Sequence, residues 1–294
     1  MNLMLKSNTY ENKIVWITGG GSGLGKKMAE GFLRLGAQVF ISGRRQEKLE
    51  ATVAEFAEKG LPKCHSYPLD VRKAEDIEKL ILFWEEQKQI PDVLVNNAAG
   101  NFIAPTETLS HKAFDVVIDI VLKGSTYCSL YIGKAWIKNK IKGAILNITT
   151  TYAASGSGFV VPSACAKAGV SNLTKSLGSE WGKYGIRVNA IAPGPIPTKG
   201  AWERLFPGDL AKKFDLRDSN PLGRFGEPEE LANLATYLCS DYAGYTNGEI
   251  VTMDGGELPR NSGEFNFLEK LTQKDWLDIK NHVQAQKQAA AKKG

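Results

Sequence analysis

The sequence predicts an α/β fold of the Rossmann-like, doubly wound type, a mostly parallel sheet with helices on both faces. Short β-rich runs alternate with longer amphipathic stretches along the chain, which is the pattern of βαβ units. A glycine-rich turn at residues 18–25 follows the first of these runs and opens the first amphipathic stretch. In such folds ligands bind where parallel strands end. We therefore expect the functional residues at the carboxyl ends of the strands.

The elements can be placed by hydrophobic periodicity. Strands are predicted at 13–18, 38–42, 92–96, 143–149, 187–192 and 248–253, with a weaker one at 63–69. Helices are predicted at about 24–35, 46–59, 74–88, 110–139, 163–183 and 227–240. Together these elements predict one Rossmann-like domain over residues 1–257.

Two segments depart from this alternation. Residues 195–226 are rich in proline and charge, and we interpret them as a loop-and-helix lid over the substrate site. Residues 258–294 form a predicted helical extension. Its helix, at about 273–290, carries Trp276, Ile279 and Val283 at core-facing spacing.

Composition limits the classes of function. The chain has 294 residues, 43% of them hydrophobic, which is enough for a large single core. Its net charge of +5 fits either a solvated surface or a preference for anionic ligands such as a phosphorylated cofactor or a coenzyme A ester. No basic run suggests nucleic acid. The four cysteines and three histidines show no metal-ligand spacing, so we expect reduced thiols and no metal.

We expect no targeting signal from the terminal residues given in the sequence. The first residues lack a signal-peptide core or transit character, and no apolar run approaches the ~18 residues of a membrane span. We expect a cytoplasmic protein, and a processed mitochondrial form is the open alternative.

The glycine-rich turn predicts a dinucleotide site. Its glycines have T-G-x-x-x-G-x-G spacing, which differs from G-x-G-x-x-G. The turn would present backbone amides to a pyrophosphate at the start of a helix. The residues expected there are Gly19, Gly20, Gly21, Ser22, Gly23 and Leu24.

The end of the second strand indicates which dinucleotide binds. An NAD enzyme usually places an acidic residue there for the ribose 2′-hydroxyl, but this chain has Arg44 and Arg45. Because guanidinium groups suit a 2′-phosphate, NADPH is the predicted cofactor. The alternative is two solvated arginines at a helix start.

Three further strand ends supply cofactor candidates. Asp70 and Val71 follow the third strand and are expected at the adenine, and Asn97 follows the fourth, near the adenosine ribose. A P-G-P-I segment follows the sixth strand and is expected at the nicotinamide carboxamide: Pro193, Gly194, Pro195 and Ile196. Taken singly, an Asp there is often a helix cap and P-G-P an ordinary turn.

These motifs, with N-N-A-x-G and Lys167 one turn into the helix after the fifth strand, resemble the short-chain dehydrogenase/reductase family over about residues 12–257. The acid–base set of that family is Asn, Ser, Tyr and Lys, and the corresponding residues here are Val121, Thr150, Ser163 and Lys167. The usual tyrosine is therefore missing. Serine is a far weaker acid, so ordinary carbonyl chemistry is not expected at Ser163.

A narrower resemblance accounts for the missing tyrosine. Residues 96–102, 149–153, 156–164, 193–201 and 262–266 resemble the NADPH-dependent 2,4-dienoyl-CoA reductases of the mitochondrial type. The resemblance implies reduction of 2,4-dienoyl-CoA to 3-enoyl-CoA in β-oxidation of unsaturated fatty acids. It implies that Tyr152 and Asn101 hold the dienolate oxygen, that Lys167 binds the nicotinamide ribose and that Ser163 supports the pocket.

The same resemblance implies a homotetramer and a set of acyl-CoA contacts. These contacts are Arg44, Arg72, Phe102, Ser110 and Arg204, although Arg72 and Arg204 are also plausible as plain surface charges. Two other functions stay open. One is a related trans-2-enoyl-CoA or carbonyl reductase, and the other is a non-catalytic NADP(H)-binding module.

Overall fold

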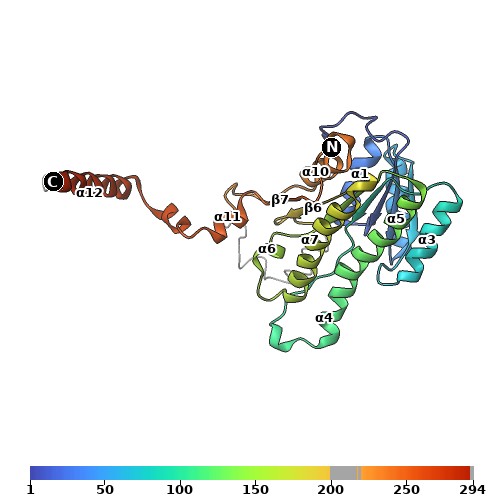
Figure 1. Cartoon of the computed structure of the whole chain (residues 1–294), viewed down its shortest axis with the longest axis horizontal. Coiled ribbons are helices and arrows are strands. Elements are labelled where there is room, and N and C mark those ends of the chain that lie inside the picture. The colour runs from blue at the N-terminus through green and yellow to red at the C-terminus, as the bar shows by residue number, and fades with distance from the viewer. Residues whose placement is uncertain (199–216, 218–219, 292–294) are drawn as a thin grey trace.

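The structure is a computed structural model that describes residues 1–198, 217 and 220–291, and in these residues seven strands form one parallel sheet (Figure 1). The strand order is β3-β2-β1-β4-β5-β6-β7. The strands are β1 (Ile14–Thr18), β2 (Gln38–Gly43), β3 (Cys64–Pro68), β4 (Val93–Asn96), β5 (Ala144–Ile148), β6 (Arg187–Pro193) and β7 (Ile250–Met253). The order reverses between β1 and β4, and a crevice opens at such a switch point. The predicted fold class and all seven predicted strands are confirmed.

Helices cover both faces of the sheet. One face carries α1 (Gly23–Arg34), α2 (Gln46–Glu58) and α10 (Pro228–Cys239). The other carries α3 (Ala74–Glu86), α5 (Gly124–Asn139) and α7 (Val161–Trp181), with α4 (His111–Ile118) beside α7. The side chains of β1 alternate between these layers: Val15 and Ile17 pack toward the first, and Trp16 packs on Trp84 of α3.

The predicted helix at 110–139 is interrupted. A π-helical turn, Asp119–Lys123, separates α4 from α5. Ser125 and Thr126 donate their hydroxyls to the carbonyls of Val121 and Leu122, at 2.7 and 2.8 Å, which satisfies groups near the irregular turn. Gly124 then lets the helix approach β3's outgoing loop, since a Cβ there would lie 2.6 Å from Val71 Cγ2. Hydrophobic periodicity does not report such an interruption.

The run His111–Asn139 is long and apolar enough, by length and composition alone, to cross a membrane. No such run was expected from the sequence. In the structure 44% of its most apolar window is buried, and α5 packs on α3 and α7 in the core. A core helix of this kind meets the same criterion, so the run is weak evidence for a span.

The C-terminal extension leaves the sheet domain. It contains α11 (Glu257–Ser262), a 3-10 turn at Asn266–Lys270 and α12 (Gln273–Ala291), and Figure 1 shows it reaching away from the other helices. Trp276, Ile279 and Val283 are 42–50% exposed. The expectation that they face a core within the chain was wrong, because no element of the described chain lies opposite them. Most of the predicted lid, residues 199–216 and 218–219, lies outside the described residues.

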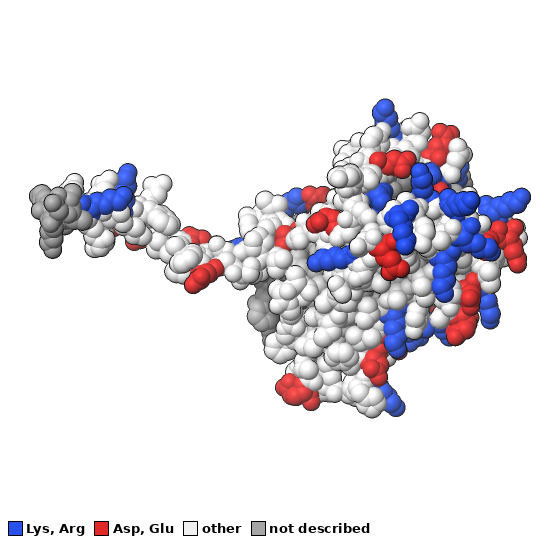
Figure 2. Space-filling view, viewed as in Figure 1, with Lys and Arg blue, Asp and Glu red and all other residues white. Residues whose placement is uncertain are grey.

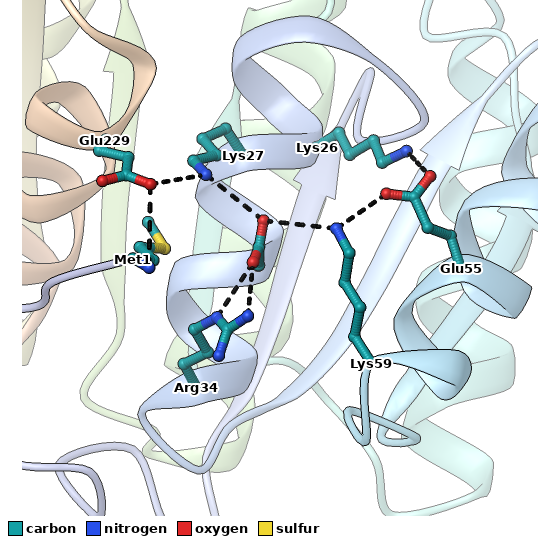
Figure 3. Close-up of polar contacts among 8 residues, drawn as sticks. Met1, Lys26, Lys27, Arg34, Glu55, Lys59 and Glu229 are labelled. Atoms are coloured by element: carbon teal, nitrogen blue, oxygen red, sulfur yellow. Dashed lines mark hydrogen bonds and ion pairs between the residues drawn. The ribbon is translucent and has the colours of Figure 1, made fainter.

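An ion network fastens α1 to α2 and α10 (Figure 3). Its centre is the buried Glu30, whose carboxylate pairs with Arg34 at 2.8 Å, Lys27 at 3.5 Å and Lys59 at 4.0 Å. Burial alone would raise the pKa of Glu30, but the Arg34 hydrogen bond and the three cations hold it below its ordinary value. Lys27 also reaches Glu229 on α10. The network therefore stabilises the helices behind the glycine-rich turn.

Candidate active site

The glycine-rich turn has no room for side chains. Gly19 has a φ of +67°, and a Cβ there would lie 3.0 Å from Asn97 Nδ2. A Cβ on Gly25 would lie 2.5 Å from the same atom. Ser22, the N-cap of α1, makes no side-chain capping bond, so the first amides of the helix stay available to an anion. The turn fits a pyrophosphate.

Thr18 and Asn97 lock the turn to the end of β4. Thr18 Oγ1 accepts hydrogen bonds from the backbone N–H groups of Asn97 and Ala98, both at 3.0 Å. Asn97 Nδ2 in turn donates to the carbonyls of Thr18 and Gly19, at 2.9 and 3.3 Å. The side-chain amide of Asn97 therefore holds the turn. Sequence reasoning omitted Thr18 from the site, although a hydroxyl at the end of a buried strand was a usable signal.

The ends of β2 and β3 bring charged side chains to the cofactor edge. Arg44 and Arg45 follow β2 and are exposed. After β3, Asp70 accepts from Arg72 through Nε at 3.0 Å and Nη2 at 2.5 Å. The Arg72 hydrogen bond lowers the pKa of Asp70, and the nearby Arg44 adds to the effect. Asp70, expected at the adenine, and Arg72, expected at the acyl-CoA, thus form an ion pair with each other.

The side chain of Val71 does not face this edge. It is 7% exposed and belongs to the core beneath α5. Its side chain therefore packs in the core, and only its backbone is left for the predicted cofactor contact.

The segment after β6 crosses the carboxyl ends of the strands. Gly194 donates its N–H to the Met253 carbonyl at 3.0 Å, and a Cβ there would lie 2.8 Å from Asp254 Cβ. Pro195 accepts from the Gly226 N–H at 3.1 Å, and Ile196 packs into the cluster of buried residues beside α10. Further on, a Cβ on Gly23 would lie 3.2 Å from Thr198 Oγ1. The segment therefore reaches the glycine-rich turn.

Three polar side chains from three elements meet beyond this edge. Tyr152 is the first residue of the short helix α6 (Tyr152–Ser155), directly after β5. Its hydroxyl accepts from Asn101 Nδ2 at 3.3 Å and lies 3.1 Å from Ser163 Oγ, near the start of α7. We call Asn101, Tyr152 and Ser163 the donor cluster.

The orientation of the Asn101 side chain in the donor cluster is fixed by a hydrogen bond to its amide oxygen. The Asn101 Oδ1 atom accepts from the backbone N–H of Phe102 at 2.9 Å, which leaves Nδ2 facing Tyr152. Phe102 is half-buried and packs against Val117 and Val121. A packed hydrophobic cluster thus holds the loop that carries the amide.

Lys167 lies one turn beyond Ser163 on α7 and is buried. Its ammonium donates to the Ile148 carbonyl at the end of β5. Burial lowers the pKa of Lys167 to about 8. Val121, at the position where the resembled family has asparagine, is fully buried against Ala166 and Val170 of α7.

Two acyl-CoA candidates remain, Ser110 and Arg204. Ser110 is the N-cap of α4 and accepts from the Ala113 N–H at 3.2 Å. Arg204 lies outside the described residues. A cavity of about 420 Å³ sits at the amino ends of the strands, beside Lys13, Asp92 and Arg187. It is at the opposite end of the sheet from the strand ends that carry the described cofactor and donor-cluster candidates, so the site is located by its polar groups and not by cavity size.

The fold and the glycine-rich turn define a protein of the dinucleotide-binding Rossmann class. Within that class, the profile of the family described as Enoyl-(Acyl carrier protein) reductase matches residues 19–257. The chain belongs to the short-chain dehydrogenase/reductase family.

Relatives with assigned names match most of the chain. It is 44% identical over 289 residues to the probable 2,4-dienoyl-CoA reductase 3 [(3E)-enoyl-CoA-producing] of Caenorhabditis elegans, covering 95% of this chain and 92% of that protein. It is 47% identical over 249 residues to the probable 2,4-dienoyl-CoA reductase [(2E)-enoyl-CoA-producing] of Bacillus subtilis (strain 168), covering 84% and 97%.

Solved structures share the fold. A short chain dehydrogenase from Bacillus anthracis superposes with a TM-score of 0.75 at 50% identity, covering 83% of this chain and 96% of that one. A gluconate 5-dehydrogenase from Burkholderia cenocepacia, solved in complex with NADP and tartrate, superposes with a TM-score of 0.78 at 26% identity, covering 85% and 97%.

Proposed function

We propose that this protein is an NADPH-dependent 2,4-dienoyl-CoA reductase that forms 3-enoyl-CoA in the β-oxidation of unsaturated fatty acids. The observation that carries the proposal is the donor cluster. A tyrosine hydroxyl from α6 lies within hydrogen-bond distance of Asn101 and Ser163, while the usual tyrosine position on α7 holds Ser163. The name of the Caenorhabditis elegans relative supports the same reaction and product. The Bacillus subtilis relative is also named a 2,4-dienoyl-CoA reductase, but for the (2E)-enoyl product, so its name supports the substrate and not the product.

The donor cluster suits a charge that develops on a thioester oxygen. A bound NADPH would supply a hydride to C5 of the diene, and the electron pair would move through the conjugated carbons to that oxygen. Donors aimed at such an oxyanion lower the barrier. The Tyr152 hydroxyl has one hydrogen, and it can donate this hydrogen bond to the substrate oxygen when its own oxygen accepts hydrogen bonds from Asn101 and Ser163. Asn101 Nδ2 carries a second hydrogen for the same oxygen.

The site of protonation decides the product. A proton added from water at C2 of the dienolate yields the 3-enoyl ester, whereas a proton added at C4 yields the 2-enoyl ester. We propose C2, since Tyr152 and Asn101 would hold the adjacent oxygen. Reduction in deuterated water, with the product read by NMR, tests this: deuterium at C2 is expected, and deuterium at C4 would contradict it.

The cofactor and assembly complete the proposal. Arg44 and Arg45 would hold the 2′-phosphate of NADPH, and Lys167 the nicotinamide ribose hydroxyls. We also propose a homotetramer with interfaces on α4–α5 and α7, because Val116 and Leu130 are 47% and 37% exposed there. Light scattering after size exclusion tests the assembly, and a monomer would contradict it.

The proposed activity is tested by NADPH oxidation with three thioesters side by side: 2,4-hexadienoyl-CoA, crotonyl-CoA and acetoacetyl-CoA. Turnover chiefly of the dienoyl ester is expected. Turnover chiefly of crotonyl-CoA would indicate an enoyl reductase, the activity that the description of the matching family names. Chief turnover of acetoacetyl-CoA would show that carbonyl chemistry survives without a tyrosine at position 163. NADPH binding with no turnover would favour a non-catalytic module.

A further inference from the structure

A backbone hydrogen bond joins two loops that carry or flank residues of the donor cluster. The Ala104 N–H donates to the Phe159 carbonyl at 3.0 Å. The first loop follows β4 and carries Asn101, and the second runs from α6, which starts at Tyr152, to α7. The bond therefore ties residues close to both expected oxyanion donors to each other.

Each loop exposes one large apolar side chain at this junction. Phe159 is 64% exposed and Ile103 is 42% exposed. Phe159 also has a φ of +64°, in the left-handed region that phenylalanine rarely adopts. Strain of this kind persists where the surroundings hold it, and it gathers at functional sites. Between α6 and Phe159 the loop is only Gly156-Ser157-Gly158, and a Cβ on Gly156 or Gly158 would meet nothing of the described chain within 4 Å.

The junction is uncharged. Residues 93–106 and 143–166 contain no Asp, Glu, Lys or Arg, and Figure 2 shows a largely white area over the lower part of α7, below a basic side chain that lies across the middle of this helix. The phosphates of coenzyme A would find no cation in these segments. An apolar chain, in contrast, would remove Phe159 and Ile103 from water at no cost in buried charge.

We propose that Phe159 and Ile103 bind the acyl chain beyond the diene and so set the chain-length preference. The inference rests on the proposed function and extends it, since it assigns the substrate class as dienoyl esters with an apolar chain that continues past the conjugated carbons. The two joined loops carry both Asn101 and the apolar pair Phe159 and Ile103. The reacting carbons and the distal acyl chain would therefore be bound by adjacent parts of the same two loops.

The test compares kcat/KM for 2,4-hexadienoyl-, 2,4-decadienoyl- and 2,4-tetradecadienoyl-CoA in the wild type, Phe159→Asn and Ile103→Asn. Asparagine tolerates the left-handed conformation, so Phe159→Asn removes the ring without adding strain. The ratio of tetradecadienoyl to hexadienoyl kcat/KM is expected to fall about 10-fold in each variant, the usual scale for a lost apolar contact. Tyr245→Asn, which removes a fully exposed aromatic ring at the amino end of the sheet, is the matched control and should keep the wild-type ratio.

The outcomes separate this inference from the proposed function. Equal losses on all three esters, or no losses, in a Phe159 variant that keeps the wild-type melting temperature would overturn the inference. Phe159→Leu gives a second check, because it keeps an apolar side chain and should retain most of the wild-type ratio. Failure of the wild type to reduce any of the three esters would instead overturn the proposed function.

Discussion

Asn101 Nδ2 lies 3.3 Å from the Tyr152 hydroxyl oxygen, although 51 residues separate the two in the chain. The contact exists because β4 and β5 are neighbours in the sheet, and each residue follows the carboxyl end of its strand. It places a phenol beside an amide at the edge where the cofactor is expected. The first two predictions test the use of this pair.

Tyr152→Phe should lower kcat for 2,4-hexadienoyl-CoA by about 10²–10³-fold, the usual loss when one donor to an oxyanion is removed. NADPH affinity should be nearly unchanged, because the glycine-rich turn and the arginines are untouched. Steady-state kinetics and fluorescence titration of NADPH measure the two effects. A near-normal kcat would remove Tyr152 from the mechanism.

Ser163→Ala should do less damage than Tyr152→Phe. Ser163 contacts the Tyr152 hydroxyl at 3.1 Å and is 2% exposed, so we expect it to act through the tyrosine, with a loss of about 3–10-fold for one hydrogen bond. Kinetics of both variants on one substrate give the order. The reverse order would restore the ordinary dehydrogenase mechanism, with the residue at position 163 as the acid.

Arg44→Asp should shift cofactor preference from NADPH toward NADH. The new carboxylate would repel a 2′-phosphate and accept from a ribose 2′-hydroxyl. The ratio of kcat/KM with the two cofactors measures the shift. Arg224→Asp changes an exposed arginine of the loop before α10 and serves as a charge-matched control. An unchanged ratio in Arg44→Asp would show that the phosphate is held elsewhere.

The protonation of Lys167 predicts a pH dependence. Burial lowers its pKa to about 8, so NADPH affinity should decline as pH rises through about 8 and the ammonium loses its proton. Below that pH the folded protein buries a charged lysine, which lowers the unfolding free energy. This destabilisation decreases as pH rises from the pKa of Lys167 in the folded protein toward its higher pKa in the unfolded chain. Lys167→Met should therefore raise the unfolding free energy without cofactor at pH 7, by about 1–3 kcal/mol, and weaken NADPH binding. Denaturant titrations of both proteins check this, and a destabilised variant would contradict it.

Glu30→Gln should reduce the unfolding free energy by about 1–2 kcal/mol at pH 7, since it weakens the hydrogen bond of the buried Glu30 carboxylate with the more exposed Arg34 and removes its charge attraction to two lysines. The pKa of Glu30 is depressed in the fold, so its contribution is present above the unfolded value and disappears as pH falls through the folded one. The unfolding free energies of the wild type and the variant should then become equal at acidic pH. Glu55→Gln alters a more exposed member of the network and should cost less. Equal losses in the two variants would argue against the central position of Glu30.

Removal of residues 264–294 should leave the sheet domain folded, with a melting temperature within about 2 °C of the full chain, a shift below 1 kcal/mol. Side chains of the extension are largely exposed, and the Bacillus subtilis relative matches over 249 residues, 97% of its own length. Calorimetry of both proteins tests this. Failure of the shortened chain to fold would show that the extension belongs to the core.

The sequence by itself was sufficient for the fold because its signals are local. Short, nearly continuous apolar runs mark most strands of a sheet that is buried on both faces, and the glycine spacing marks the turn where a Cβ would strike Asn97. Likewise, the absence of an acid after β2 is visible without coordinates. The assignment of Tyr152 and Asn101 came from resemblance and not from spacing, since no pattern of residues 51 positions apart predicts a hydrogen bond.

Tertiary structure alone decided how those residues are used. It showed the Asp70–Arg72 ion pair, the use of the Asn97 amide in holding the turn, and the burial that depresses the pKa of Lys167. It also showed that Val71 packs in the core and that the apolar stripe of α12 meets nothing within the described chain. Hydrogen bonding, charge pairing and burial depend on which distant segments come together, and that is set by the packing of the sheet and its helices.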